Sequence, residues 1–124
     1  MNPNEITARE ARARQLHQQG YNCCQSVVMA FADLLPIPAE QALAMAAPFG
    51  RGLSGLKQTC GCVNAMALVC GLTGNSHAVR PLGQRFQEEH GDLNCFRLLQ
   101  LQGQGHTCND LVASAARLLA ETLL

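Results

Sequence analysis

The chain has 124 residues, of which 48% are hydrophobic and 15% are charged, which is typical of a folded domain rather than a disordered chain. Nine basic and nine acidic residues cancel, and Lys57 is the single lysine, so we exclude nucleic acid as a partner. The first 20 residues lack the apolar region of a signal peptide, and no apolar run approaches the roughly 20 residues of a membrane-spanning helix. We therefore expect a cytoplasmic protein without membrane insertion.

The sequence predicts an all-α fold, namely a compact single domain over residues 1–124 with about five to seven helices. Alternating β-branched runs, which would indicate strands, are absent. The N-terminal half has clear helix boundaries: Asn2-Pro3 is a typical start, Gly20 a typical end, and Pro36 and Pro38 break the second helix. The helices predicted here are 3–20, 22–35 and 38–47, followed by a glycine-rich loop over 48–58.

The C-terminal half begins with a helix predicted over 59–72. This segment is apolar nearly all round, so we expect it to be the buried central helix. The remaining predicted helices are 81–90, 94–102 and 107–124, with a turn over 103–106.

Seven cysteines are the unusual feature of the composition. An odd number cannot be fully paired in disulfides, and the cysteine content is below the roughly 8–10% of secreted disulfide scaffolds. In a reducing compartment, clustered cysteines are more often metal-binding or redox-active than structural. We therefore expect the chemistry of this chain to depend on its thiols.

Four cysteines each follow a residue that favours the N-cap position of a helix. In the first turn, free backbone N–H groups and the helix dipole favour a thiolate, which both metal binding and thiol exchange require. The chain has no Cys-x-x-Cys pair, so the fold would have to gather these residues into an iron–sulfur or zinc site. The alternative is a set of buried thiols without a ligand. The four pairs are Asn22-Cys23, Thr59-Cys60, Asn94-Cys95 and Thr107-Cys108.

The other three cysteines are interpreted first as core residues. Cys70 lies within the apolar helix and is predicted to be a small buried side chain. Cys24 and Cys62 are also predicted in the core, and the alternatives are that they act as resolving thiols or as extra metal ligands. His106, two residues before Cys108, is a further candidate ligand.

The loop contains a literal G-x-G-x-x-G over residues 50–55. No strand is predicted before it and no helix opens at its third glycine, so a dinucleotide site is not indicated. We interpret the loop as closely packed backbone that delivers Cys60 to its helix. Arg51 and Lys57 could meet an anionic ligand or partner, or could be solvated loop charges.

Four segments carry a resemblance to a known family. They are Tyr21-Asn22-Cys23-Cys24-Gln25-Ser26-Val27-Val28, Thr59-Cys60-Gly61-Cys62-Val63-Asn64-Ala65, Asn94-Cys95-Phe96-Arg97-Leu98-Leu99 and Cys108-Asn109-Asp110-Leu111-Val112. In these the chain resembles the C_GCAxxG_C_C family, small bacterial and archaeal redox-active proteins with four separated cysteines and a Cys-Gly-Ala-x-x-Gly core. A related domain occurs in split-Soret cytochromes.

The resemblance implies redox or metal chemistry on Cys23, Cys60, Cys95 and Cys108, the same four that follow N-cap residues. The chain departs from the family pattern at three positions: Cys62 and Cys24 stand where alanine is usual, and Ala65 where glycine is usual. The two additional thiols could extend the site.

Three functions follow as hypotheses. The first is an iron–sulfur cluster on Cys23, Cys60, Cys95 and Cys108 for electron transfer or sensing, with a redox partner protein. The second is a metal-free thiol–disulfide enzyme or sensor in which Cys60 attacks and Cys62 or Cys23 resolves. The third is a structural zinc site in an interaction module. A homo-oligomer is compatible with each.

Overall fold

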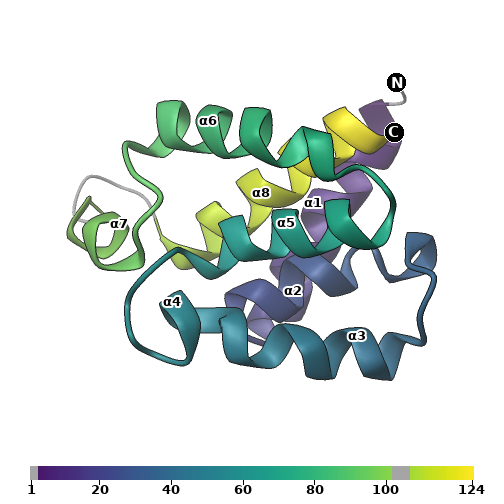
Figure 1. Cartoon of the computed structure of the whole chain (residues 1–124), viewed down its shortest axis with the longest axis horizontal. Coiled ribbons are helices and arrows are strands. Elements are labelled where there is room, and N and C mark those ends of the chain that lie inside the picture. The colour runs from purple at the N-terminus through teal and green to yellow at the C-terminus, as the bar shows by residue number, and fades with distance from the viewer. Residues whose placement is uncertain (1–2, 102–106) are drawn as a thin grey trace.

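A computed structural model describes residues 3–101 and 107–124, and its regular elements are helices (Figure 1). The predicted all-α fold is confirmed. Within the described ranges, β-type pairing is confined to an isolated bridge between Thr59 and Asn94. No helix in these ranges is long and apolar enough to cross a membrane. The elements, with η for 3₁₀ helices, are α1 (Pro3–Gln18), α2 (Cys23–Met29), η1 (Ala32–Leu34), α3 (Ala39–Ala46), η2 (Ala47–Phe49), α4 (Gly50–Leu53), α5 (Gly61–Leu72), η3 (Ser76–Ala78), α6 (Val79–His90), α7 (Cys95–Leu101) and α8 (Cys108–Leu123).

The second helix is shorter than the sequence predicted. It ends at Met29 instead of continuing to residue 35. The Arg9 guanidinium donates to the free carbonyl oxygen of Ala30 at 2.7 Å, pairs with Asp33 and lies over the Phe31 ring. These contacts satisfy a helix end with a side chain from α1, a long-range contact that local propensity does not encode.

Two further boundaries differ from the prediction. Helix α6 begins at Val79, two residues before Pro81, because proline is tolerated in the first turn of a helix. The segment 48–58, predicted as a loop, contains η2 and the single turn α4. Within α4, Arg51 and Gly52 have left-handed backbone, with φ of 55° and 67°, so this turn is not a regular helix.

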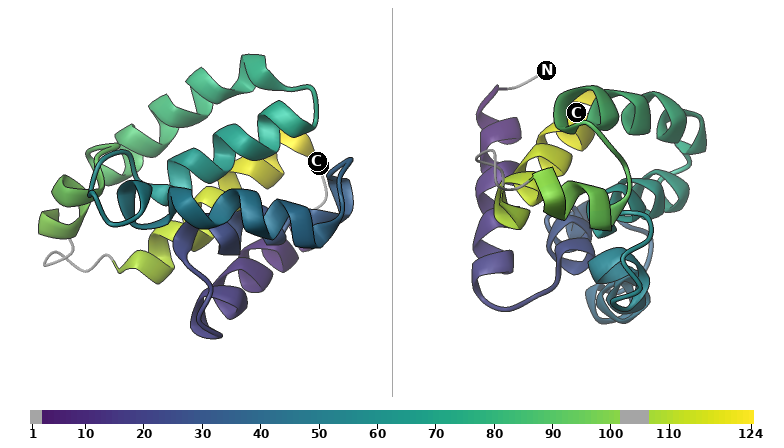
Figure 2. Two further views of the ribbon diagram at one scale, coloured as in Figure 1. Left: turned by 60° about the horizontal axis from the view of Figure 1, so that its bottom comes forward. Right: turned by 90° about the vertical axis from the view of Figure 1, so that its left-hand side faces the viewer.

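Helix α5 is central, as its apolar sequence predicted. It contacts α2, α4, α6 and α8, and Figures 1 and 2 show it surrounded by these helices. Its inner side chains join a hydrophobic core that draws on most of the other helices. The largest fully buried side chains of that core are Phe31, Phe86, Met66, Leu82, Leu118 and Leu119.

Helices α1 and α8 share the most extensive contact in the fold, and a polar cluster fixes where α8 begins. Arg14 donates to Asn109 Oδ1 at 2.6 Å and to Asp110 Oδ1 at 2.9 Å. Asn109 Nδ2 in turn donates to the Arg14 carbonyl oxygen and lies 3.1 Å from His17 Nδ1. The C-terminal end of α1 is thereby held beside Cys108.

We expect Leu119→Ala to lower the free energy of unfolding by about 2–5 kcal/mol, because it removes a fully buried side chain and leaves a cavity in the core. Leu56→Ala is the control, since Leu56 is 65% exposed and its replacement is expected to change stability by no more than about 0.5 kcal/mol. Urea denaturation followed by circular dichroism measures both. Equal effects of the two substitutions would contradict the described packing.

Candidate functional site

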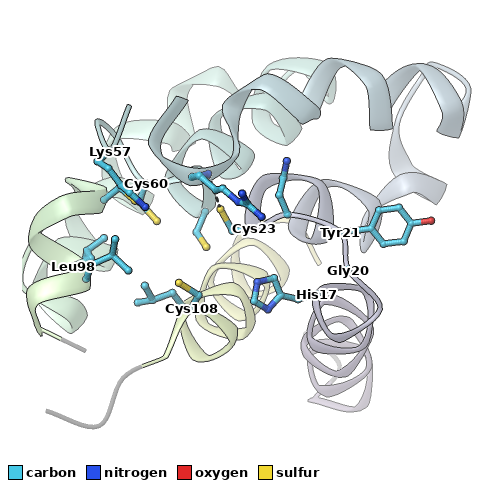
Figure 3. A pocket seen from close by; sticks show the side chains of 14 residues that line it. His17, Gly20, Tyr21, Cys23, Lys57, Cys60, Leu98 and Cys108 are labelled. Carbon is cyan, nitrogen blue, oxygen red and sulfur yellow. Dashed lines mark hydrogen bonds between the residues drawn. The ribbon is translucent and has the colours of Figure 1, made fainter. Parts of the chain in front are cut away.

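Five of the seven cysteines line one cavity of about 280 Å³ at the side of the molecule where α2, α5, α7 and α8 begin. Leucines of α7 and α8 form its apolar wall, and His17, Arg51 and Lys57 contribute polar groups (Figure 3). The four cysteines that follow N-cap residues are all present, although they are distant in sequence. The fifth is Cys62. The lining cysteines are Cys23, Cys60, Cys62, Cys95 and Cys108.

The predicted caps hold for three of the four helices. Asn22 and Thr107 each form a complete capping box, with Gln25 and Asp110, and Cys23 and Cys108 are the first residues of α2 and α8. Asn94 Oδ1 accepts the backbone N–H of Arg97 at 3.1 Å, and Cys95 is the first residue of α7. These side chains determine where each helix starts and therefore where each thiol lies.

The prediction for Cys60 is wrong by one position. Cys60 is itself the N-cap residue of α5, which begins at Gly61, and Thr59 lies outside the helix. The reason is that the backbone at Thr59 pairs with Asn94: Cys60 N donates to Leu93 O at 2.8 Å, and Cys95 N donates to Gln58 O at 2.6 Å. This pairing fixes the starts of α5 and α7 side by side and brings Cys60 next to Cys95.

The Cys23 sulfur rests directly on the backbone of Gly61. A Cβ atom at this position would lie 2.4 Å from Cys23 Sγ, 3.0 Å from Phe49 O and 3.1 Å from Gly50 Cα. A side chain at this position would therefore force the Cys23 sulfur to move. The Cys23 sulfur also accepts the backbone N–H of Arg51 at 3.4 Å. Cys23 is therefore held between the start of α5 and the turn α4.

Two of the three loop glycines serve close packing, as predicted, whereas nothing lies within 4 Å of a Cβ at Gly55. A Cβ at Gly50 would lie 2.3 Å from Asn22 Cγ, within the cap of α2. Gly52 has a φ of 67°, and a Cβ there would lie 2.7 Å from Cys95 Cβ. The loop therefore connects the start of α2 to the start of α7, and it forms one wall of the cavity.

Cys62 shifts the pKa of two neighbouring cysteines through hydrogen bonds. Its hydrogen bonds to Cys23 and Cys60 hold its proton and raise its own pKa well above the ordinary value, an effect that burial reinforces. The hydrogen bond from Cys62 is also the largest cause that lowers the pKa of Cys23, to about 6, and the backbone N–H of Arg51 adds to it. When Cys62 donates to Cys60 instead, that hydrogen bond lowers the pKa of Cys60, aided by the N–H groups of Cys62 and Val63. Because Cys62 has one proton, it donates to one of these sulfurs at a time.

The remaining two lining cysteines differ in environment. Burial raises the pKa of Cys95, the neighbouring Cys60 thiol raises it further, and the Lys57 ammonium opposes both. Cys108 is exposed at the mouth of the cavity. The site thus grades from a buried side at Cys60 and Cys62 to an open side at Cys108.

Two cysteines do not line the cavity. Cys24 and Cys70 are both fully buried in the hydrophobic core, and burial raises the pKa of each. Cys70 is the core residue that the sequence predicted, whereas the alternative of Cys24 as an extra ligand finds no place on the cavity wall. His106 lies outside the described residues. Within the described ranges, no three His, Cys, Asp or Glu side chains are gathered closely enough to hold a single metal ion.

The sequence predicts Cys62 first as a core residue, with a resolving thiol or an extra ligand as alternatives. It is buried, and it also lines the cavity and forms hydrogen bonds with Cys23 and Cys60. The signal was its spacing: in Cys60-Gly61-Cys62 the first cysteine caps the helix and the second lies in the first turn. The hydrogen bond from the Arg51 backbone N–H to Cys23 could not be predicted. The direction of this N–H depends on a left-handed φ at Arg51, and no sequence signal indicates that conformation.

Gly61→Ala is expected to displace Cys23 from the cavity and to lower the free energy of unfolding by about 1–3 kcal/mol, because the new Cβ overlaps the sulfur and two backbone atoms. The matched control in the same helix is Gly71→Ala. Nothing lies within 4 Å of a Cβ at Gly71, so this change should raise stability by about 0.5–1 kcal/mol. Thermal or urea unfolding measures both, and a Gly61→Ala protein as stable as Gly71→Ala would contradict the contact.

In the reduced, metal-free protein, the rate at which iodoacetamide alkylates Cys23 should rise with pH around a midpoint of about 6. Cys62→Ala should move that midpoint upward, because it removes the main group that stabilises the Cys23 thiolate. Cys70→Ala should leave it unchanged, since Cys70 does not line the cavity. Peptide mass spectrometry of alkylated samples gives the rate for each cysteine; a Cys23 midpoint near the ordinary thiol value would count against the described hydrogen bonds.

A comparison with protein families gives one finding. The family model described as "Putative redox-active protein (C_GCAxxG_C_C)" matches residues 21–122, which include all seven cysteines. The comparisons with curated proteins and with solved structures gave no significant match. The family match covers most of the chain, including every helix start that contributes to the cavity. The chain therefore belongs to the C_GCAxxG_C_C family of redox-active proteins.

Proposed function

We propose that the protein binds an iron–sulfur cluster on Cys23, Cys60, Cys95 and Cys108, and that it transfers electrons or senses redox state through it. One observation carries this proposal: four cysteines from four separate helix starts line a single cavity of about 280 Å³. Iron–sulfur clusters are held by cysteine thiolates, and the ligands can come from distant parts of a chain. A cluster occupies a volume, so ligands distributed over the walls of a cavity suit it.

The donor set and its surroundings fit such a group. The lowered pKa values of Cys23 and Cys60 favour the thiolate form that a metal requires. Leu98 is 3% exposed and Leu111 is 4% exposed, so they bring apolar surface to the cavity and keep water from part of its wall. When bound, the cluster would supply one-electron transfer at a potential set by its surroundings.

Hydrogen-bond donors and a cation of the chain would then adjust the charge on the ligand sulfurs. The Arg51 N–H donates to the Cys23 sulfur, and the Cys62 thiol donates to Cys23 or Cys60. Donors to ligand sulfurs reduce their negative charge, which raises a reduction potential. The Lys57 ammonium acts on Cys95 in the same sense. All seven cysteines are free thiols, which suits the reducing cytoplasm that we include in this proposal.

A second candidate is thiol–disulfide exchange without a metal, and the contacts of Cys62 favour it. The Cys62 thiol holds its proton and shares it in hydrogen bonds with Cys23 or Cys60. Cys23 would be the attacking thiolate, because Cys60, at 5% exposure, is less accessible than the half-buried Cys23. This assigns attack to Cys23, whereas the sequence hypothesis assigned it to Cys60.

The proposed thiol exchange has two steps. The Cys23 thiolate attacks one sulfur of a substrate disulfide, forms a mixed disulfide and releases the other substrate sulfur as a thiolate. Cys62 loses its proton to that departing thiolate and attacks the Cys23 sulfur, which frees the second substrate thiolate. The substrate gains two electrons, and the Cys23–Cys62 pair loses two in forming its disulfide.

Anaerobic purification followed by reconstitution with iron and sulfide tests the cluster. We expect equal amounts of bound iron and sulfide with visible charge-transfer absorption, and we expect Cys95→Ser and Cys108→Ser to lose most of both. Cys70→Ala is the matched control, because Cys70 is buried away from the cavity and should leave the bound iron unchanged.

The outcomes separate the candidates. A colourless protein that takes up no iron would overturn the cluster. Stoichiometric zinc with loss of folding on chelation would instead support the structural zinc site. A metal-free protein with a reversible Cys23–Cys62 disulfide, detected by peptide mass mapping, would support thiol exchange.

A further inference from the structure

Exposed apolar side chains gather beside the cysteine cavity. Leu53 is 40% exposed, Leu56 is 65% exposed and Phe96 is 54% exposed. The leucines lie in the segment between Gly52 and Cys60 and Phe96 in the first turn of α7, and both segments border the cavity. Figure 2 (right) turns this side of the molecule toward the viewer.

The two segments are joined by backbone hydrogen bonds, so these exposed side chains are carried by neighbouring segments. Phe96 N donates to Lys57 O at 3.4 Å, and Cys95 N donates to Gln58 O at 2.6 Å. Such contacts hold Phe96 near the loop that carries the two leucines. We call the set Arg51, Leu53, Leu56, Lys57 and Phe96 the docking face.

The docking face carries two positive charges that form no ion pair within the described residues. Arg51 and Lys57 are exposed, and neither forms an ion pair with a carboxylate in the described residues. Between Glu40 and Glu88 the sequence contains no Asp or Glu at all. Although the molecule is neutral overall, Arg51 and Lys57 are thus exposed cations without acidic neighbours in the surrounding sequence.

We propose that the docking face binds an acidic redox protein, which exchanges electrons with the cysteine site. This inference rests on the proposed function, since an electron-transfer site needs a partner that approaches it closely. Exposed apolar side chains beside cations are the composition of a small, transient interface, in which apolar contact supplies affinity and charge directs the encounter. In each exchange, one redox centre loses one electron and the other gains it.

Charge complementarity favours a strongly acidic protein over a second copy of this chain, because this chain is neutral overall. Asp92 and Asp110 lie near Cys95 and Cys108 in the sequence. They already form ion pairs with Arg97 and Arg14, respectively. A partner with a surplus of carboxylates supplies the complement that Arg51 and Lys57 lack within the chain. Self-association is therefore an outcome that the test distinguishes.

The experiment is an NMR titration of the isotope-labelled 124-residue chain with an acidic flavodoxin at low salt. We expect saturable shifts at residues 51–57 and 96. Lys57→Glu and Leu56→Ser should each weaken binding about tenfold, and raising the ionic strength should weaken it further. Arg80→Glu is the matched control, because it makes the same charge change in the first turn of α6, at the opposite end of the molecule from α7 (Figure 1).

Several results would overturn the docking face. These are an absence of saturable shifts, shifts centred elsewhere, equal weakening by Lys57→Glu and Arg80→Glu, or equally tight binding of a basic cytochrome c. Shifts that depend on protein concentration without flavodoxin would identify self-association instead. Iron content and visible absorption of the same wild-type and variant samples test the proposed function separately: loss of the cluster in all of them overturns that function, whereas the titration alone decides the docking face.

Discussion

The contact between the Cys23 sulfur and the backbone of Gly61 is the constraint on which the site depends. It sets how closely α2 and α5 approach, because a side chain at Gly61 would overlap the sulfur and the backbone of α4. That approach leaves the Cys23 sulfur within reach of the Cys62 thiol and of the Arg51 N–H. The lowered pKa of Cys23 is thus a consequence of packing rather than of any nearby cation.

A second set of contacts brings the remaining thiols to the same place. The pairing of Thr59 with Asn94 fixes α7 beside α5, and Arg14 with Asn109 fixes the start of α8 against α1. Each is a backbone or polar interaction between segments far apart in the chain. Together they explain how cysteines at four separate helix starts line one cavity while the apolar core is assembled on the other faces of the same helices.

The sequence was sufficient for the fold class, the central helix and three of the four helix caps, because each depends on local signals. An asparagine or threonine before a cysteine describes its own helix start, and an apolar segment predicts its own burial. The start of α5 could not be predicted in this way. Thr59 pairs with Asn94, 35 positions later, and therefore does not serve as the N-cap residue of α5. The same holds for α2, whose end is stabilised by Arg9 from α1. The place of Cys62 needed the three-dimensional neighbours of its sulfur.

The backbone of the loop before α5 has a consequence for access to the cavity. Arg51, Leu53, Ser54 and Lys57 are non-glycine residues with positive φ, between 50° and 73°, and such a conformation costs about 1–2 kcal/mol per residue. The loop is held in this form by its own backbone hydrogen bonds and by contacts with α2, α5 and α7. Opening the loop releases the strain while it breaks those contacts, so the net free energy of opening is lower than the contacts alone would require. The cavity wall that carries the Arg51 N–H therefore stores conformational strain, and this strain lowers the free-energy cost of a local opening beside the buried sulfurs.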